Sequence, residues 1–224
     1  MFLSGVQLAL SDVLVSEGPD FSRAKRLDLG SGAWIEWAPG WLAGHLAFFE
    51  AVRASAAWER HRRIMFERVV EVPRLVAACP GDAPRAPLPG HERIERRPAE
   101  ASAAEVARVR ARLLELGDAL RRRFGRRLDR IQLALYRDGR DAVAMHADHV
   151  GARKGDSVVA VLSLGAPRRF LLRPRRGVAG RPRTFHAGEG DLLVMGGSCQ
   201  ATFEHGVPRM REAGPRLAIM FRED

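Results

Sequence analysis

The sequence predicts an α+β fold in which a jelly-roll core fills the C-terminal half and N-terminal helices pack on its sheet. Two observations support this prediction. From Ile131 onward, apolar residues recur with a period of two, and glycine-rich turns separate the short runs, which is typical of β-sandwiches and barrels. Before Ile131, two segments have apolar residues at helical spacing.

The first hundred residues mix short regular segments with a proline-rich stretch. Residues 1–38 alternate weakly between apolar and polar side chains, which predicts short strands. The segment Trp41–Val52 has the apolar spacing of an amphipathic helix. Cys79–Pro98 is rich in proline and predicts a loop or flexible lid, too short to separate two domains.

The clearest predicted helix is Ser102–Phe124. Ser102 and Glu105 have the spacing of a capping box, in which each residue satisfies a backbone N–H of the other. The helix ends in a basic last turn followed by Gly125, a common C-terminal stop. We expect its apolar stripe to pack on a sheet.

The C-terminal half predicts a series of strands joined by glycine-containing turns. The strand candidates are 131–137, 142–148, 157–164, 168–173, 191–195, 199–205 and 215–222. No internal repeat is present.

The composition is that of a globular protein with a strong basic excess. The chain has 37 Lys and Arg against 27 Asp and Glu, a formal charge of +10, and its lysines are Lys25 and Lys154 alone. A genome-wide preference for arginine explains this excess, and so does an anionic partner such as nucleic acid. No apolar run reaches membrane-spanning length. Cys79 and Cys199 are too few for a disulfide framework, so we expect a cytoplasmic protein.

The stretch Ile131–Val150 carries the most informative chemistry. His146 and Asp148 are two residues apart, so on a strand both side chains point the same way. His205 lies in another strand-like run. Two histidines and one carboxylate form the protein ligand set of non-haem Fe(II) sites. An H-x-D triplet alone is also common as the polar end of a surface strand.

The last predicted strand has two different faces. Arg216, Ala218, Met220 and Arg222 lie on one face, and the other face is apolar. Arginine forks bind carboxylates well, so this face could line a polar cavity that holds a small dicarboxylate. A solvent-facing edge strand is the alternative interpretation.

Two segments combine features that suit a nucleic-acid surface. Trp58–Pro73 mixes aromatic and basic residues, which suits base stacking and phosphate contacts, although taken alone the segment fits a helix-to-strand connection with a solvated basic face slightly better. A predicted hairpin supplies a second basic surface, or a simply exposed one. Its arginines are Arg168, Arg169, Arg173, Arg175, Arg176, Arg181 and Arg183.

Taken in order, the runs Y-R-D-G-R-D, H-A-D, S-L-G, F-E-H-G-V-P and R-L-A-I-M-F-R resemble the AlkB family of Fe(II)/2-oxoglutarate dioxygenases. The resemblance spans Gln132–Arg222. It implies a double-stranded β-helix (jelly-roll) core and one domain over residues 1–224. Residues 1–100 would form an N-terminal extension and nucleotide-recognition lid, and residues 101–224 the supporting helix and catalytic core.

The resemblance also assigns roles to individual residues. The Fe(II) ligands would be His146, Asp148 and His205. The residues that bind 2-oxoglutarate would be Tyr136, Arg216 and Arg222. With O2, the family oxidises N-alkyl groups on nucleobases and releases formaldehyde from methylated ones, in alkylation damage repair. The implied partner is alkylated nucleic acid, with DNA favoured over RNA, and we expect a monomer without a membrane or protein partner.

The chain departs from the family pattern near the expected site. Ala134 and Ala218 stand where the family commonly has Asn, and His149 and Val150 stand where acidic residues usually follow the metal Asp. Two alternatives therefore stay open. One is the same oxygenase chemistry on a protein or small-molecule substrate, and the other is a non-catalytic nucleic-acid-binding module.

Overall fold

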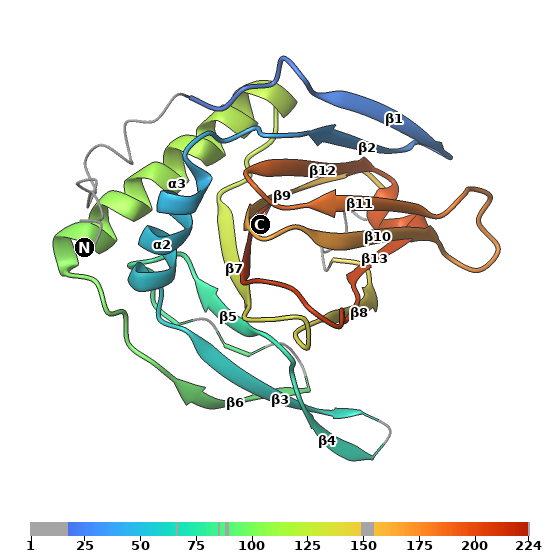
Figure 1. Ribbon diagram of the computed structural model, residues 1–224. Helices are drawn as coiled ribbons and strands as arrows, with labels where there is room; N and C mark the ends of the chain where they lie inside the picture. Colours follow the sequence, from blue (N-terminus) through green and yellow to red (C-terminus); the bar gives the residue numbers. More distant parts are fainter. Residues whose placement is uncertain (1–17, 66, 85, 88–89, 149–154, 224) are drawn as a thin grey trace, which may run out of the picture.

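The computed structural model describes residues 18–65, 67–84, 86–87, 90–148 and 155–223 (Figure 1). In these ranges the chain forms two β-sheets that lie face to face, and two helices cover the outer side of the larger sheet (Figure 1). None of the helices in the described ranges combines the length and apolar character that crossing a bilayer requires.

The larger sheet is ten-stranded, and every recorded strand pair in it is antiparallel. Its strands, in spatial order, are β1 (Lys25–Gly30), β2 (Ala33–Ala38), β12 (Asp191–Gly197), β9 (Ser157–Gly165), β14 (Arg216–Arg222), β7 (Arg130–Tyr136), β5 (Leu75–Ala78), β3 (Glu59–Met65) and β4 (Arg68–Glu71), with β6 (His91–Arg96) also paired to β3.

The smaller sheet has four antiparallel strands. In order they are β11 (Arg183–Ala187), β10 (Arg168–Pro174), β13 (Phe203–Val207) and β8 (Val143–His146). Two facing antiparallel sheets confirm the predicted jelly-roll core, with helices packed on one of its sheets.

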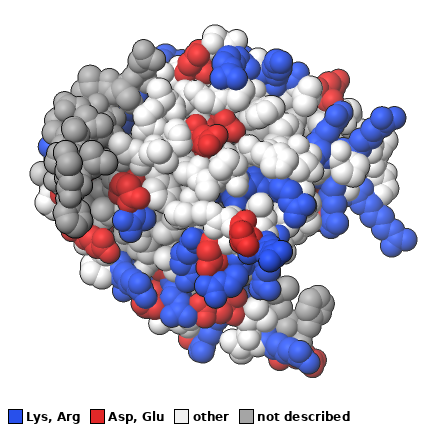
Figure 2. Space-filling view, viewed as in Figure 1, with Lys and Arg blue, Asp and Glu red and all other residues white. Residues whose placement is uncertain are grey.

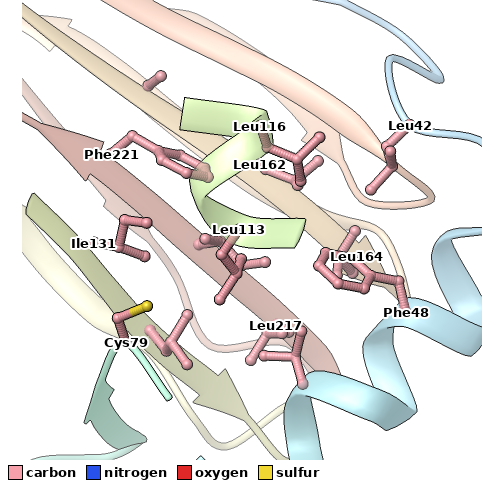
Figure 3. Packing of buried hydrophobic residues seen from close by; sticks show 14 of the residues in the cluster. Leu42, Phe48, Cys79, Leu113, Leu116, Ile131, Leu162, Leu164, Leu217 and Phe221 are labelled. Carbon is pink, nitrogen blue, oxygen red and sulfur yellow. The ribbon is translucent and has the colours of Figure 1, made fainter. Parts of the chain in front are cut away.

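The first core cluster lies between the larger sheet and the helices α2 (His45–Ser55) and α3 (Ala103–Phe124) (Figure 3). Leu113 and Leu116 of α3 pack among Leu217 and Phe221 of β14, as Figure 3 shows. These two β14 residues belong to the predicted apolar face. Burial of a leucine or phenylalanine side chain stabilises a fold by roughly 1.5–3 kcal/mol.

The ends of α3 follow the sequence signals. Ser102 and Glu105 make both hydrogen bonds of a capping box, and Gly125 has a φ of 67° at the C-cap. This left-handed conformation is open to glycine without a Cβ penalty. The predicted helix is confirmed with its N-terminal boundary one residue later.

A second core cluster lies between the two sheets. It joins Ala134, Tyr136 and Ala218 of the larger sheet to Phe170 and Leu172 of the smaller one. The β14 face that carries the two arginines therefore looks into the space between the sheets. This placement confirms the predicted division of that strand into an apolar and an arginine face.

Three element predictions were wrong in detail. The first helix begins at His45, because Trp41 and Leu42 are buried ahead of it rather than on it. The expected loop Cys79–Pro98 contains β6, which pairs along β3 despite the surrounding prolines. The predicted strand 199–205 begins as the short helix α4 (Cys199–Thr202) and becomes strand only at Phe203.

Two further differences concern the edges of predicted elements. Strand β11 was not among the candidates, because its short apolar signal is interrupted by exposed polar residues. In the N-terminal stretch the structure describes β1 and β2, whereas residues 1–17 of that prediction lie outside the described residues.

Candidate metal centre

Adjacent strands bring two histidines together. His146 is the last residue of β8, and it pairs in register with His205 on β13. The centroids of the two imidazole rings are 4.4 Å apart. Nδ1 of His146 donates to the carbonyl of Ala144 at 2.9 Å, which leaves the Nε2 lone pair available as a ligand. His205 is buried against the ring of Phe170, at a centroid distance of 5.4 Å.

Asp148 lies beyond the end of β8, so the strand argument that placed it beside His146 was incomplete. Its position is fixed by two side chains from elsewhere in the fold. The Oδ1 atom accepts from Nη2 of Arg222, and the backbone N–H donates to Oε1 of Gln200 at 2.8 Å. The other carboxylate oxygen, Oδ2, lies 3.5 Å from Nε2 of His205.

The three side chains form a donor set for a cation. One ligand atom from each of His146, Asp148 and His205 lies within 4.8 Å of the others. Oδ2 of Asp148 is buried and has no hydrogen-bond partner among the described residues. A buried carboxylate oxygen without a partner costs free energy, which a bound cation would offset. The residues present therefore fit a metal ion.

Burial sets the protonation state of the site. It lowers the pKa of His205 to about 4 and also holds the pKa of His146 below its ordinary value. Burial alone would raise the pKa of Asp148, but Arg222 and the two imidazoles together hold it below its usual range. At neutral pH the site thus presents two neutral imidazoles and one carboxylate, which is the protonation state that binds metals.

The face of β14 that looks between the sheets ends in the two expected arginines. Arg216 is buried, pairs in register with Tyr136, and lies over its ring at 5.2 Å from the centroid. Its Nη2 donates to Oγ of Ser163 at 2.7 Å, whereas Nε and Nη1 have no partner among the described residues. A buried guanidinium with free N–H groups fits an anionic ligand such as a carboxylate.

At the other end of β14, Arg222 contacts both Asp148 and Oε1 of Gln132. Its Nε also lacks a partner in the described part of the chain. Arg216 and Arg222 are six residues apart on one strand, a span of roughly 20 Å before their side chains turn inward. The guanidinium of Arg222 therefore lies beside the donor set, and the guanidinium of Arg216 lies deeper between the sheets.

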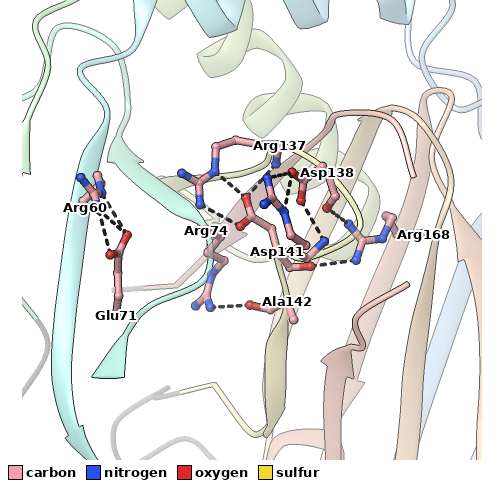
Figure 4. Close-up of polar contacts among 9 residues, drawn as sticks. Arg60, Glu71, Arg74, Arg137, Asp138, Asp141, Ala142 and Arg168 are labelled. Carbon is pink, nitrogen blue, oxygen red and sulfur yellow. Dashed lines mark hydrogen bonds and ion pairs between the residues drawn. The ribbon is translucent and has the colours of Figure 1, made fainter. Parts of the chain in front are cut away.

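The turn that leads into β8 is held by a polar network (Figure 4). Arg168 is completely buried, and its guanidinium donates to the carbonyls of Asp138, Asp141 and Pro208 at 2.8–2.9 Å. Arg137 forms a bidentate pair with Asp141 (Figure 4). The sequence grouped Arg168 with the exposed basic hairpin, which was wrong because its side chain points into the fold and holds this turn.

The proposed aromatic and basic surface at Trp58–Pro73 also needs correction. Trp58 is buried, and its Nε1 donates to the carbonyl of Arg53 at 2.8 Å, so it is not exposed for base stacking. Arg60 pairs with Glu71 and Glu95. The segment forms the hairpin β3–β4 rather than a connection, and part of its basic charge is neutralised within the sheet.

Other arginines keep their charge available. The arginine hairpin, residues 169–183 of β10, β11 and their connection, exposes Arg169, Arg173, Arg176, Arg181 and Arg183. Among the described residues, only Arg173 of this group forms an ion pair, with Glu204 at 3.2 Å. Figure 2 shows basic side chains gathered at this hairpin and a hollow between it and the β3–β4 hairpin.

On the β3–β4 side, Arg63 and Arg74 are half-buried and form no ion pair in the described ranges. Both lie close enough to His91 to help burial lower its pKa. Arg74 also acts on the pKa of His146 and donates to the carbonyl of Ala142 at 3.3 Å (Figure 4). The positive charges of Arg63 and Arg74 therefore lie on this side of the donor set, and that of Arg74 is close enough to affect His146.

Gln200, Ser163 and Gln132 are site neighbours that sequence reasoning missed. Ser163 begins the S-L-G run, but no local pattern gives the partner of any of the three residues, because these contacts join residues far apart in the chain. His149 and Val150, which depart from the family pattern, lie outside the described residues.

Two histidines and an aspartate held between the sheets of a jelly roll form the arrangement of non-haem Fe(II) oxygenases. The family model of the 2OG-Fe(II) oxygenase superfamily matches residues 36–222, so the chain belongs to that superfamily. Its members use Fe(II), 2-oxoglutarate and O2, which confirms the expected cofactors.

Two curated relatives match part of the chain. The uncharacterized protein R406 of Acanthamoeba polyphaga mimivirus is 32% identical over 90 residues, covering 39% of this chain and 46% of that protein. The alpha-ketoglutarate-dependent dioxygenase alkB homolog 3 of Bos taurus is 28% identical over 124 residues, covering 49% of this chain and 41% of that protein. The chain thus spans less than half the length of either relative.

A solved structure supports the fold. An oxidoreductase of the 2OG-Fe(II) oxygenase family from Burkholderia pseudomallei is similar with a TM-score of 0.52 and 17% sequence identity. The match covers 98% of this chain and 92% of that one. At this identity the likeness concerns the fold alone.

Proposed function

We propose that this dioxygenase is AlkB-like and oxidatively removes N-alkyl groups from nucleic-acid bases. The observation that carries the proposal is the basic hollow between the arginine hairpin and the β3–β4 hairpin, where arginines on both sides form no ion pair among the described residues. Such a surface suits a phosphate backbone, while a base turned out of its stack reaches the metal. The partial likeness to the bovine alkB homolog 3 is consistent with it.

In this proposal His146, Asp148 and His205 hold Fe(II). Tyr136 and Arg216 orient the distal carboxylate of 2-oxoglutarate, and Arg222 orients the end near the metal. The bound iron, 2-oxoglutarate and O2 supply the oxidation of the alkyl carbon. The protein binds and orients its ligands, and it excludes water by placing the cosubstrate groups between two packed sheets.

We further propose that residues 1–224 form one domain in which the β3–β4 side of the hollow acts as the nucleotide-recognition lid. Its favoured partner is alkylated DNA rather than RNA, bound by a monomer. Cys79 and Cys199 are both buried, and neither forms a disulfide in the described part of the chain, which suits a reducing compartment such as the cytoplasm.

The test has two stages. Anaerobic addition of Fe(II) and 2-oxoglutarate to the purified chain should produce a visible charge-transfer band, and His146→Ala should abolish it. The chain should then release formaldehyde from a single-stranded oligonucleotide that carries N1-methyladenine. Absence of the band would refute the ligand set. A normal band with succinate formation, but without formaldehyde from any alkylated base, would instead indicate a protein or small-molecule substrate.

A further inference from the structure

Gln200 connects the two segments that supply the donor set. It lies on α4, the short helix between β12 and β13, and is 1% exposed. Its Oε1 accepts the backbone N–H of Asp148 at 2.8 Å across 52 positions of sequence. The same helix continues directly into β13, which carries His205.

The backbone of Asp148 needs this contact. The residue follows the end of β8, and the strand ladder recorded between β8 and β13 does not extend to it. Without an acceptor, the buried N–H would be left unsatisfied, which is unfavourable. Arg222 already holds Oδ1 of the same residue. Gln200 and Arg222 together leave Oδ2 as the oxygen that lies beside His205.

We propose that Gln200 is a positioning residue for the metal centre. Its amide oxygen fixes the main chain of Asp148, so that Oδ2 stays on the same side as the nitrogens of His146 and His205. The inference rests on the ligand set given under the proposed function. Groups that orient metal ligands commonly change metal affinity by about 10- to 100-fold when they are replaced.

The variant Gln200→Met separates positioning from packing. Methionine has nearly the shape of glutamine and suits the neighbouring sulfur of Met195, which lies 3.8 Å from Nε2, but it offers no comparable acceptor to Asp148. Gln200→Glu keeps an acceptor oxygen at the same distance along the side chain. Ser198→Ala is the matched control, since it removes a hydrogen bond from the residue that precedes α4, to the carbonyl of Ser31, without reaching Asp148.

The experiment is titration of the metal-free chain with Mn(II), with free metal measured by electron paramagnetic resonance and folding by thermal denaturation. We expect Gln200→Met to weaken Mn(II) binding at least 10-fold, Gln200→Glu to weaken it less, and Ser198→Ala to leave it within 2-fold of the parent.

Equal affinities for the parent, Gln200→Met and Ser198→Ala would overturn the inference while leaving the ligand set intact. If Gln200→Met does not fold, the Gln200→Glu variant decides. Affinity near that of the parent supports the role of the acceptor oxygen, and a loss as large as that of Asp148→Ala overturns it. Failure of the parent itself to bind Mn(II) would refute the ligand set, and this inference with it.

Discussion

At the scale of single residues, the site is defined by polar groups that the fold buries without complete pairing. Oδ2 of Asp148 and two nitrogens of Arg216 lack partners within the described part of the chain. Buried polar groups without partners raise the free energy of the folded protein. A bound cation would pair with Oδ2 of Asp148, and a bound anion would pair with Arg216. The free energy of unfolding is thus lower than it would be with a fully apolar core. The same unpaired groups form two binding positions, one for a cation at Asp148 and one for an anion at Arg216.

His205 makes the metal-free chain sensitive to acid. Its pKa is about 4 in the fold and about 6.5 in an unfolded chain, so the unfolded state binds more protons between these values. Stability is therefore retained above pH 6.5 and is lost as the pH falls. We expect a loss of roughly 2 kcal/mol between pH 6.5 and 5.

This effect is measured by urea denaturation of the metal-free chain at both pH values. In His205→Gln the loss should be clearly smaller. An identical loss in the variant would show that other groups cause the acid sensitivity.

Arg216 should control affinity for 2-oxoglutarate without controlling affinity for the metal. Replacing it with methionine removes the buried guanidinium that lies over Tyr136 and donates to Ser163. We expect 2-oxoglutarate binding to weaken at least 10-fold, since roughly 1.5–3 kcal/mol is lost with a charged hydrogen bond. Calorimetric titration with 2-oxoglutarate measures this, and Mn(II) affinity is the control. A parallel loss of both affinities would argue against the assignment.

At the scale of elements, the sequence was most informative where the signals are local. The capping box and Gly125 delimit α3 closely, and the period of two separates the faces of β14. Strand β6 could not be recognised within the proline-rich segment. Its partner β3 lies about 30 residues earlier, and pairing over that distance leaves no local pattern in the sequence. The roles of Arg168 and Gln200 depend on long-range contacts in the same way.

Arg168 illustrates how two neighbouring arginines on β10 can differ. It donates to three backbone carbonyls around the turn before β8, whereas Arg169 is exposed on the opposite face. We expect Arg168→Met to destabilise the chain by roughly 3 kcal/mol, because three buried carbonyls lose their donors. Chemical denaturation of both variants tests this. Arg169→Met is the matched control and should be as stable as the parent. Equal stability of the two variants would contradict the role given to Arg168.

At the scale of the whole molecule, the formal charge of +10 is the sum of arginines that form ion pairs and arginines that do not. Many arginines are neutralised by carboxylates, as Arg62 is by Glu92 and Arg126 is by Asp156. The arginines without an ion pair among the described residues include Arg169, Arg176 and Arg181 of the arginine hairpin, and Arg63 and Arg74 on the β3–β4 side of the hollow. Composition could suggest an anionic partner, but only the folded chain shows which arginines remain available for it.

This division predicts the salt dependence of nucleic-acid binding. Replacing Arg169, Arg176 and Arg181 with serine should weaken binding of a single-stranded oligonucleotide. It should also reduce the slope of log Kd against log salt concentration by about 2, since each phosphate contact contributes about 0.7. Fluorescence anisotropy over a range of salt concentrations measures both quantities.

The matched control removes the same charge from paired positions. Arg53 on α2, together with Arg126 and Arg127, can serve because each pairs with a carboxylate, and replacing these three with serine should change the slope far less. Equal effects of the two triple variants would mean that net charge alone, rather than the hollow, determines binding.

Strand β14 carries both Arg216, which would bind the distal carboxylate of the cosubstrate, and Arg222, which lies beside the donor set. Arg222 already contacts Asp148, and in the proposed site the same guanidinium also meets the cosubstrate. Iron bound to Asp148 would partly neutralise its carboxylate, and this would change how strongly Arg222 binds the cosubstrate. Thermodynamic reciprocity requires that, if iron strengthens cosubstrate binding by some factor, the cosubstrate strengthens iron binding by the same factor. The chain would therefore release its metal most readily when cosubstrate is scarce, so that the supply of a metabolite governs retention of the iron.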